Sequence, residues 1–256
     1  MLFRSANKQA FLWGRRAAHD LARVERLFAS AEVVPIEHAR PRTLDELVER
    51  RVALLTEYQD AGYAERYRKL VERVREAERP LGGTQLTETV ARHYAKLLAY
   101  KDEYEVARLY SRPEFRRGLE AAFEGEYALR FHFAPPRLAR RDPATGRPRK
   151  IAFGGWMAFA LKNLAKLRFL RGKALDPFGR TAERQTERRL IAEYEATIDE
   201  LLRGLSAERH ATAVEIAALP EDIRGFGPVK AESIGKVKAR EAELLARYRA
   251  PAARAA

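Results

Sequence analysis

The sequence of 256 residues contains no cysteine. Disulfides, thiolate nucleophiles, cysteine-ligated zinc and cysteine-bound iron–sulfur clusters are therefore excluded within this chain. The five histidines are scattered, and neither HxxxH nor HExxH occurs to favour a histidine metal site. Spacing also gives no argument for a Ser/His/Asp catalytic set. We predict no catalytic, cofactor-binding or metal-ligating residue in this chain.

Long apolar runs are lacking too. No window approaches 18 consecutive apolar residues, and the start of the chain has no signal-peptide hydrophobic run. The P-loop and GxGxxG patterns that cradle phosphates do not occur. With 46% hydrophobic and 33% charged residues, the composition is typical of a globular protein with a heavily charged surface. We expect a cytoplasmic protein without a membrane partner.

Positive charge is abundant, with a formal net charge of +13 and 38 arginines against 11 lysines. A GC-rich genome could produce such an arginine bias, so the total charge is weak evidence for a functional basic surface. Its clustering is stronger evidence, because residues 137–189 hold fifteen Lys or Arg against four acidic residues, a net +11. Charge so localised indicates a basic surface that faces something acidic.

Eight cations of the basic stretch at residues 137–189 are the candidate binding residues, and five of them flank the DPATG turn at residues 142–146. They are Arg137, Arg140, Arg141, Arg147, Arg149, Lys150, Arg180 and Arg184. One interpretation is electrostatic docking of an acidic protein, and another is an anion pocket for the phosphates of a nucleotide or coenzyme A. The alternative is a solvated arginine surface, or arginines that pair with acids of neighbouring domains in a longer enzyme.

Two further segments have both a functional and a structural interpretation. In AYKDEYEVARLY (residues 99–110), Asp102 and Glu105 could form an acid–base or metal-binding pair, but ion pairs among buried tyrosines are the favoured interpretation. RGFGPVK (residues 224–230) could bind an anion ahead of a helix, although a helix break and restart explains it equally well.

Periodicity predicts a mainly α protein, a bundle-like packing of eight to ten helices with one small β element near residues 127–153. Capping-box patterns open helices at Thr43 and Ser111, and a second start is expected at Asp20. Alternation predicts a strand over residues 127–133, and the DPATG turn predicts a hairpin between residues 137–141 and 147–153.

The clearest helix spans residues 180–205 with a continuous apolar stripe. A basic helix with Trp156 and Phe159 follows Gly155, and a final helix covers residues 229–248. We expect residues 1–42 to be the helical tail of a preceding domain with a proline-containing linker. Residues 43–250 then form the mainly helical domain, and residues 251–256 a disordered tail.

Several sequence blocks together resemble one family. They are AYKDEYEVARLY, APPRLARRDPATGRPRK (134–150), FLRG (169–172), DPFG (176–179), TAER (181–184) and IRGFGPVK (223–230). The combination resembles the C-terminal region of indolepyruvate ferredoxin oxidoreductase-family proteins, which are fused 2-oxoacid:ferredoxin oxidoreductases. The similarity covers residues 84–250, and residues 7–21 are similar to the segment that closes the preceding domain in those proteins.

The resemblance implies oxidative decarboxylation of an aryl 2-oxoacid to an acyl-CoA, with ferredoxin as the electron acceptor. It implies that thiamine diphosphate, magnesium and iron–sulfur clusters are bound by other domains, and that this chain is an inactive fragment or subunit. The partners would be the catalytic domains of the parent enzyme and ferredoxin. The alternative is a stand-alone nucleic-acid-binding protein. The lack of a helix-turn-helix, zinc-finger or aromatic RNA-binding motif in the sequence argues against it.

Overall fold

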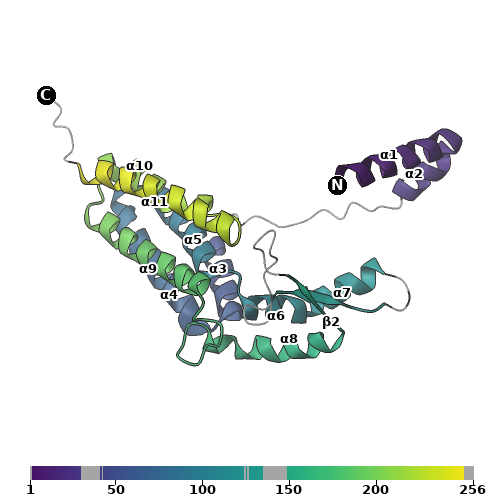
Figure 1. Cartoon of the computed structure of the whole chain (residues 1–256). Helices are drawn as coiled ribbons and strands as arrows, with labels where there is room; N and C mark the ends of the chain where they lie inside the picture. The colour runs from purple at the N-terminus through teal and green to yellow at the C-terminus, as the bar shows by residue number, and fades with distance from the viewer. Residues whose placement is uncertain are drawn as a thin grey trace. The chain divides into compact units, whose positions relative to one another are not determined.

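The structure is a computed structural model that describes residues 2–29, 41, 43–123, 125, 127–134 and 149–250. The chain divides into two compact units, Met1–Arg40 and Pro41–Ala256. Eleven α-helices and one two-stranded sheet lie within the described residues (Figure 1), which confirms the predicted mainly α fold. Among these helices, none combines the length and the apolar character that a membrane span requires.

The first unit contains two helices, α1 (Leu2–His19) and α2 (Leu21–Ala29). Asp20 separates them, and its side chain accepts a hydrogen bond from the backbone N–H of Arg23 at 2.9 Å. This contact satisfies a free N–H in the first turn of α2, so the predicted helix start at Asp20 is confirmed. The expected linker, apart from Pro41, and the expected tail at residues 251–256 lie outside the described residues.

Six helices form the larger part of the second unit, which we call the bundle (Figure 1). They are α3 (Leu44–Tyr58), α4 (Ala61–Glu78), α5 (Gln85–Leu98), α9 (Ala182–Arg203), α10 (Ala207–Ala218) and α11 (Pro228–Arg249). Short 3-10 helices follow α4 (Arg79–Leu81) and α10 (Leu219–Asp222). The hydroxyl of Thr43 accepts from the N–H of Glu46 at 3.1 Å, so the predicted cap of α3 is confirmed.

A column of three buried tyrosines runs through the bundle core. The ring of Tyr94 stacks on Tyr67 and on Tyr194, with ring centroids 5.9 Å apart in both pairs. The Tyr67 hydroxyl donates to the Ala91 carbonyl at 3.0 Å, and the Tyr194 hydroxyl to the Ala217 carbonyl at 2.9 Å. Each ring therefore buries a large apolar area while its polar end keeps a partner.

The remaining elements form a smaller part of the same unit, which we call the arm. They are α6 (Glu103–Ser111), α7 (Pro113–Ala122), β1 (Phe131–Phe133), β2 (Ile151–Phe153), α8 (Trp156–Lys166) and a 3-10 helix (Leu167–Leu170). The arm has its own small core, in which Phe131 and Leu161 are the large buried side chains. Because α8 packs against α6, the arm is closed mainly by this helix pair.

The β element differs in its pairing from the predicted hairpin. Residues 151–153 pair antiparallel with residues 131–133, with Phe131 opposite Phe153. Ring centroids of Phe133 and Phe153 lie 6.4 Å apart, so the observed pairing brings aromatic side chains together. The predicted partner, residues 137–141, contains three arginines and no aromatic residue. The predicted strand is confirmed over residues 131–133 only, and residues 137–141 lie outside the described residues.

The capping box predicted at Ser111 is wrong. Ser111 ends α6, and its hydroxyl donates to the Ala107 carbonyl at 2.6 Å instead of capping the next helix. Arg112 precedes α7 without a side-chain cap, and α7 begins at Pro113, which has no N–H to satisfy. The serine is therefore free to bond to the turn before it.

Candidate functional site

Residues 99–110 and 169–184 are distant in sequence but meet around one buried arginine. The side chains of Arg171 and Asp102 are 2% and 3% exposed. Arg171 Nε donates to Asp102 Oδ2 at 2.5 Å and Nη2 to Oδ1 at 2.9 Å, a bidentate ion pair. Asp102 Oδ1 also accepts from the N–H of Glu105 at 2.8 Å, so the carboxylate caps α6 while it holds the arginine.

Tyrosines enclose the Arg171 guanidinium. Its central carbon lies 3.5 Å from the ring centroid of Tyr58 and 5.5 Å from that of Tyr104. Arg171 Nη1 donates to the Tyr58 carbonyl, and the Tyr58 hydroxyl donates to the Tyr100 carbonyl at 2.8 Å. Burial acts to lower the pKa of Arg171, but the hydrogen-bonded Asp102 outweighs it and the net shift is upward. Arg171 is therefore a permanent internal cation.

A second buried carboxylate fixes the loop after Arg171. Asp176 Oδ2 accepts from the Gly172 N–H at 2.8 Å, and Oδ1 accepts from the Phe178 N–H at 3.0 Å and the Tyr104 hydroxyl at 3.2 Å. Burial and the negative charge of Asp176 both raise the pKa of Tyr104, so this hydroxyl stays a donor. We call Tyr58, Asp102, Tyr104, Arg171 and Asp176 the Arg171 cluster.

Further arginines neutralise the other acids of α6. Arg184 pairs with Glu103 at 3.3 Å, and Arg108 pairs with Glu105 at 2.7 Å and with Glu57 at 2.8 Å. Together with Arg171, these contacts give Asp102, Glu103 and Glu105 an arginine each. Asp102 and Glu105 are therefore members of ion pairs, which confirms the structural interpretation of this segment and leaves no acid–base pair.

The Arg171 cluster connects the bundle to the arm, because Tyr58 belongs to α3, Asp102 caps α6 and Arg171 follows the 3-10 helix after α8. Its charged groups are closed off from solvent and satisfy one another. No group of three or more His, Asp or Glu residues in the described parts of the chain could hold a metal ion. The cluster therefore acts as a structural junction between the bundle and the arm.

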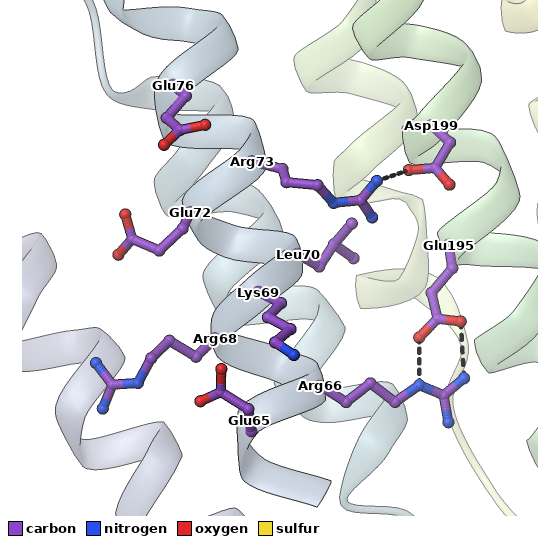
Figure 2. A pocket seen from close by; sticks show the side chains of 10 residues that line it. All are labelled: Glu65, Arg66, Arg68, Lys69, Leu70, Glu72, Arg73, Glu76, Glu195 and Asp199. Carbon is purple, nitrogen blue, oxygen red and sulfur yellow. Dashed lines mark hydrogen bonds and ion pairs between the residues drawn. The ribbon is translucent and has the colours of Figure 1, made fainter. Parts of the chain in front are cut away.

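An open groove between α4 and α9 is the other charged feature (Figure 2). Arg66 donates to both oxygens of Glu195 at 2.6 and 2.7 Å, and Arg73 pairs with Asp199 at 2.8 Å. Four cations and five anions line the groove, so its charges nearly balance. These pairs attach α4 to α9, and the groove is best described as a packing seam.

The eight predicted binding cations have different positions. Arg137, Arg140, Arg141 and Arg147 lie outside the described residues. Arg149 and Lys150 are exposed beside β2, and Arg180 is exposed ahead of α9. Arg184 is largely buried and pairs with Glu103 of α6 at 3.3 Å. Among the described residues of this set, Arg149, Lys150 and Arg180 are therefore the cations open to a partner.

The RGFGPVK segment is a helix break. Gly225 and Gly227 have φ of 89° and 56°, a region that glycine enters without strain, and Pro228 opens α11. The N–H of Arg224 donates to the Ser233 hydroxyl at 3.0 Å, and that hydroxyl donates to the Asp222 carbonyl at 2.6 Å. These contacts connect the end of the preceding 3-10 helix to the first turns of α11.

The outward face of α8 is a surface that the sequence interpretation missed. Trp156 and Phe159 are 64% and 74% exposed, whereas Leu161 and Ala165 are buried. The sequence interpretation placed Trp156 and Phe159 among the apolar residues of a basic helix without separating inner from outer positions. The signal that could have separated them is the spacing of Met157, Leu161 and Ala165, which forms one inner stripe and turns Trp156 and Phe159 outward.

Together these features define a mainly helical module in which an internal ion-pair cluster joins a bundle to a smaller arm. The chain belongs to a family of unknown function (DUF6537), whose family model matches residues 44–243. The matched range contains both the Arg171 cluster and α8. The comparisons with curated proteins and with solved structures give no match.

Proposed function

We propose that this chain is the non-catalytic C-terminal module of an indolepyruvate ferredoxin oxidoreductase-like enzyme. That enzyme oxidatively decarboxylates aryl 2-oxoacids to acyl-CoA and passes the electrons to ferredoxin. The module packs against the catalytic domains in the cytoplasm and presents a basic docking surface. Thiamine diphosphate, magnesium and iron–sulfur clusters are bound by those other domains in this proposal.

One observation carries the proposal: separate blocks of the resemblance meet in the Arg171 cluster. Asp102 and Tyr104 come from AYKDEYEVARLY, Arg171 comes from FLRG, and Asp176 comes from DPFG. If the likeness of these separate blocks were due to chance, we would not expect their side chains to form hydrogen bonds with one another in the protein interior. The contacts therefore support treating these blocks as one structural signature, and the resemblance as one relationship.

The test is to purify an affinity-tagged form of the chain from its own cells and assay the eluate. We expect reduction of a viologen dye that requires both an aryl 2-oxoacid and coenzyme A, since the module would bring its catalytic partner with it. An eluate without this activity would contradict the proposal. Recovery of nuclease-sensitive nucleic acid in its place would favour the stand-alone nucleic-acid-binding alternative.

A further inference from the structure

We propose that the outward face of α8 binds a small acidic protein, and that in the proposed oxidoreductase this protein is the electron acceptor. The inference rests on the proposed function for the identity of the acceptor. Figure 1 shows α8 at the edge of the arm, where its outer side is not covered by the bundle.

The first observation is the apolar surface of α8. Trp156 and Phe159 lie three positions apart on one side of the helix and are 64% and 74% exposed. Leu161 and Ala165 hold the opposite side against α6. The Trp156 ring contacts Phe153 of β2 edge-on, with ring centroids 5.9 Å apart, and still leaves most of its surface exposed. Large aromatic side chains exposed together mark binding surfaces, and they are the residues that most often dominate binding energy.

The second observation is the charge around these rings. Lys162 and Lys166 follow Phe159 by three and seven positions, so they share its side of α8. Both are exposed, and neither forms an ion pair with a described residue. The sequence has no acidic residue from 143 to 175, and the exposed cations among the described residues of this range are Arg149, Lys150, Lys162, Lys166 and Lys173. Such a surface is complementary to a cluster of carboxylates.

The use of lysine strengthens this argument. Arginine outnumbers lysine 38 to 11 in the chain, yet four of the eleven lysines fall within residues 150–173. Arginines elsewhere form bidentate ion pairs, as Arg66 does with Glu195. A hydrated, flexible ammonium group is poorly suited to such fixed pairs, but it attracts an acidic partner at a distance.

The apolar side chains near α8 favour a protein over a nucleic acid. Leu167 and Leu175, which follow α8 in the chain, are 43% and 79% exposed. Bases stack on aromatic faces but gain little from aliphatic groups, whereas protein interfaces combine an apolar centre with a charged rim. We therefore assign the partner a surface of carboxylates around an apolar centre.

Tryptophan fluorescence gives a direct test, since the chain has only two tryptophans. Trp13→Phe leaves Trp156 as the sole reporter, and ferredoxin from the same organism is titrated into this protein at low and high salt. We expect saturable quenching that weakens as salt rises. Added Lys162→Glu and Lys166→Glu substitutions should raise Kd by about tenfold or more.

The matched control reverses two exposed cations outside α8, Lys69→Glu and Arg203→Glu, and should change Kd by less than about twofold. In the original tryptophan background, Phe159→Ala followed by calorimetry should also weaken binding by about tenfold. Equal Kd values for the α8 and control variants would overturn the inference, as would tighter binding of single-stranded DNA or anionic vesicles than of ferredoxin. If the protein binds ferredoxin but the purified eluate has no oxidoreductase activity, the proposed function is contradicted while the docking surface on α8 is still supported.

Discussion

Arg171 forms a bidentate ion pair with Asp102, which lies 69 positions earlier in the chain. Both side chains are almost completely buried, and the central carbon of the guanidinium lies 3.5 Å from the ring centroid of Tyr58. The pair connects the segment after α8 to the start of α6 and to the end of α3. A buried pair of this kind is costly to break, because the surviving partner keeps its charge without a solvent shell.

Removing one partner of this pair should be strongly destabilising. Asp102→Asn keeps a cap for α6 but leaves the Arg171 guanidinium uncompensated, so we expect a loss of about 3–5 kcal/mol in the free energy of unfolding. Urea denaturation followed by circular dichroism measures it. Arg116→Ala, which removes a cation with an 82% exposed side chain from α7, should cost less than about 0.5 kcal/mol.

The combination of Asp102→Asn with Arg171→Met separates the charge from the packing. Methionine removes the buried cation, so the double variant should recover part of the stability that Asp102→Asn alone loses. If the losses of the two single variants simply add, the ion pair is not coupled as the geometry implies.

Gly179 should tolerate no side chain. A Cβ there would lie 2.6 Å from Asp176 Oδ2, and that carboxylate cannot move without losing its contacts to the Gly172 N–H and the Tyr104 hydroxyl. We expect Gly179→Ala to destabilise the protein by about 1–3 kcal/mol in thermal unfolding. Gly235→Ala in α11 is the control. It has open space around the new methyl group and should stabilise by about 0.5–1 kcal/mol.

Glu78 should make stability depend on pH. This buried carboxylate accepts from the N–H groups of Leu86 and Thr87 at 2.7 and 2.8 Å and contacts His210 at 2.7 Å. Burial acts to raise the pKa of Glu78, but the hydrogen bonds outweigh it and hold the pKa below the usual value of 4.5. A carboxyl whose pKa folding lowers stabilises the protein above its unfolded pKa, and this stabilisation is lost as pH falls through the folded pKa.

Glu78→Gln should therefore lower the free energy of unfolding at pH 7 by about 1.5–3 kcal/mol. This loss should be seen as a lower Tm. The difference from the wild-type protein should shrink as pH falls below 4.5. Glu65→Gln, at an exposed position of α4, serves as the control and should follow the wild-type curve. A Tm difference that is constant from pH 7 to pH 3 would contradict the assignment.

The arm should open before the bundle. Phe131 and Leu161 are the large buried side chains of its small core, whereas the bundle buries one extended apolar cluster. We expect backbone amides of α8 to exchange with solvent at least about tenfold faster than those of α5. Hydrogen exchange followed by mass spectrometry measures this ratio, and equal protection of the two helices would show that arm and bundle unfold as one.

Local patterns predicted the helices well. The apolar stripe of α9 and the caps at Asp20 and Thr43 depend on neighbours within a few positions, which the sequence displays directly. The Arg171–Asp102 pair has no such local period, so its partners could not be matched from spacing. The same limit applies to charge, because Arg171 and Arg184 belong to a basic stretch but face inward to α6 acids.

The most direct test of the account compares two electron acceptors in the purified oxidoreductase assembly. Ferredoxin must dock on a protein surface, whereas a small viologen dye needs no such surface. With Lys162→Glu and Lys166→Glu in α8, the ratio of ferredoxin to viologen reduction rates should fall by about tenfold or more at low salt. A ratio equal to that of the Lys69→Glu and Arg203→Glu control would contradict the account.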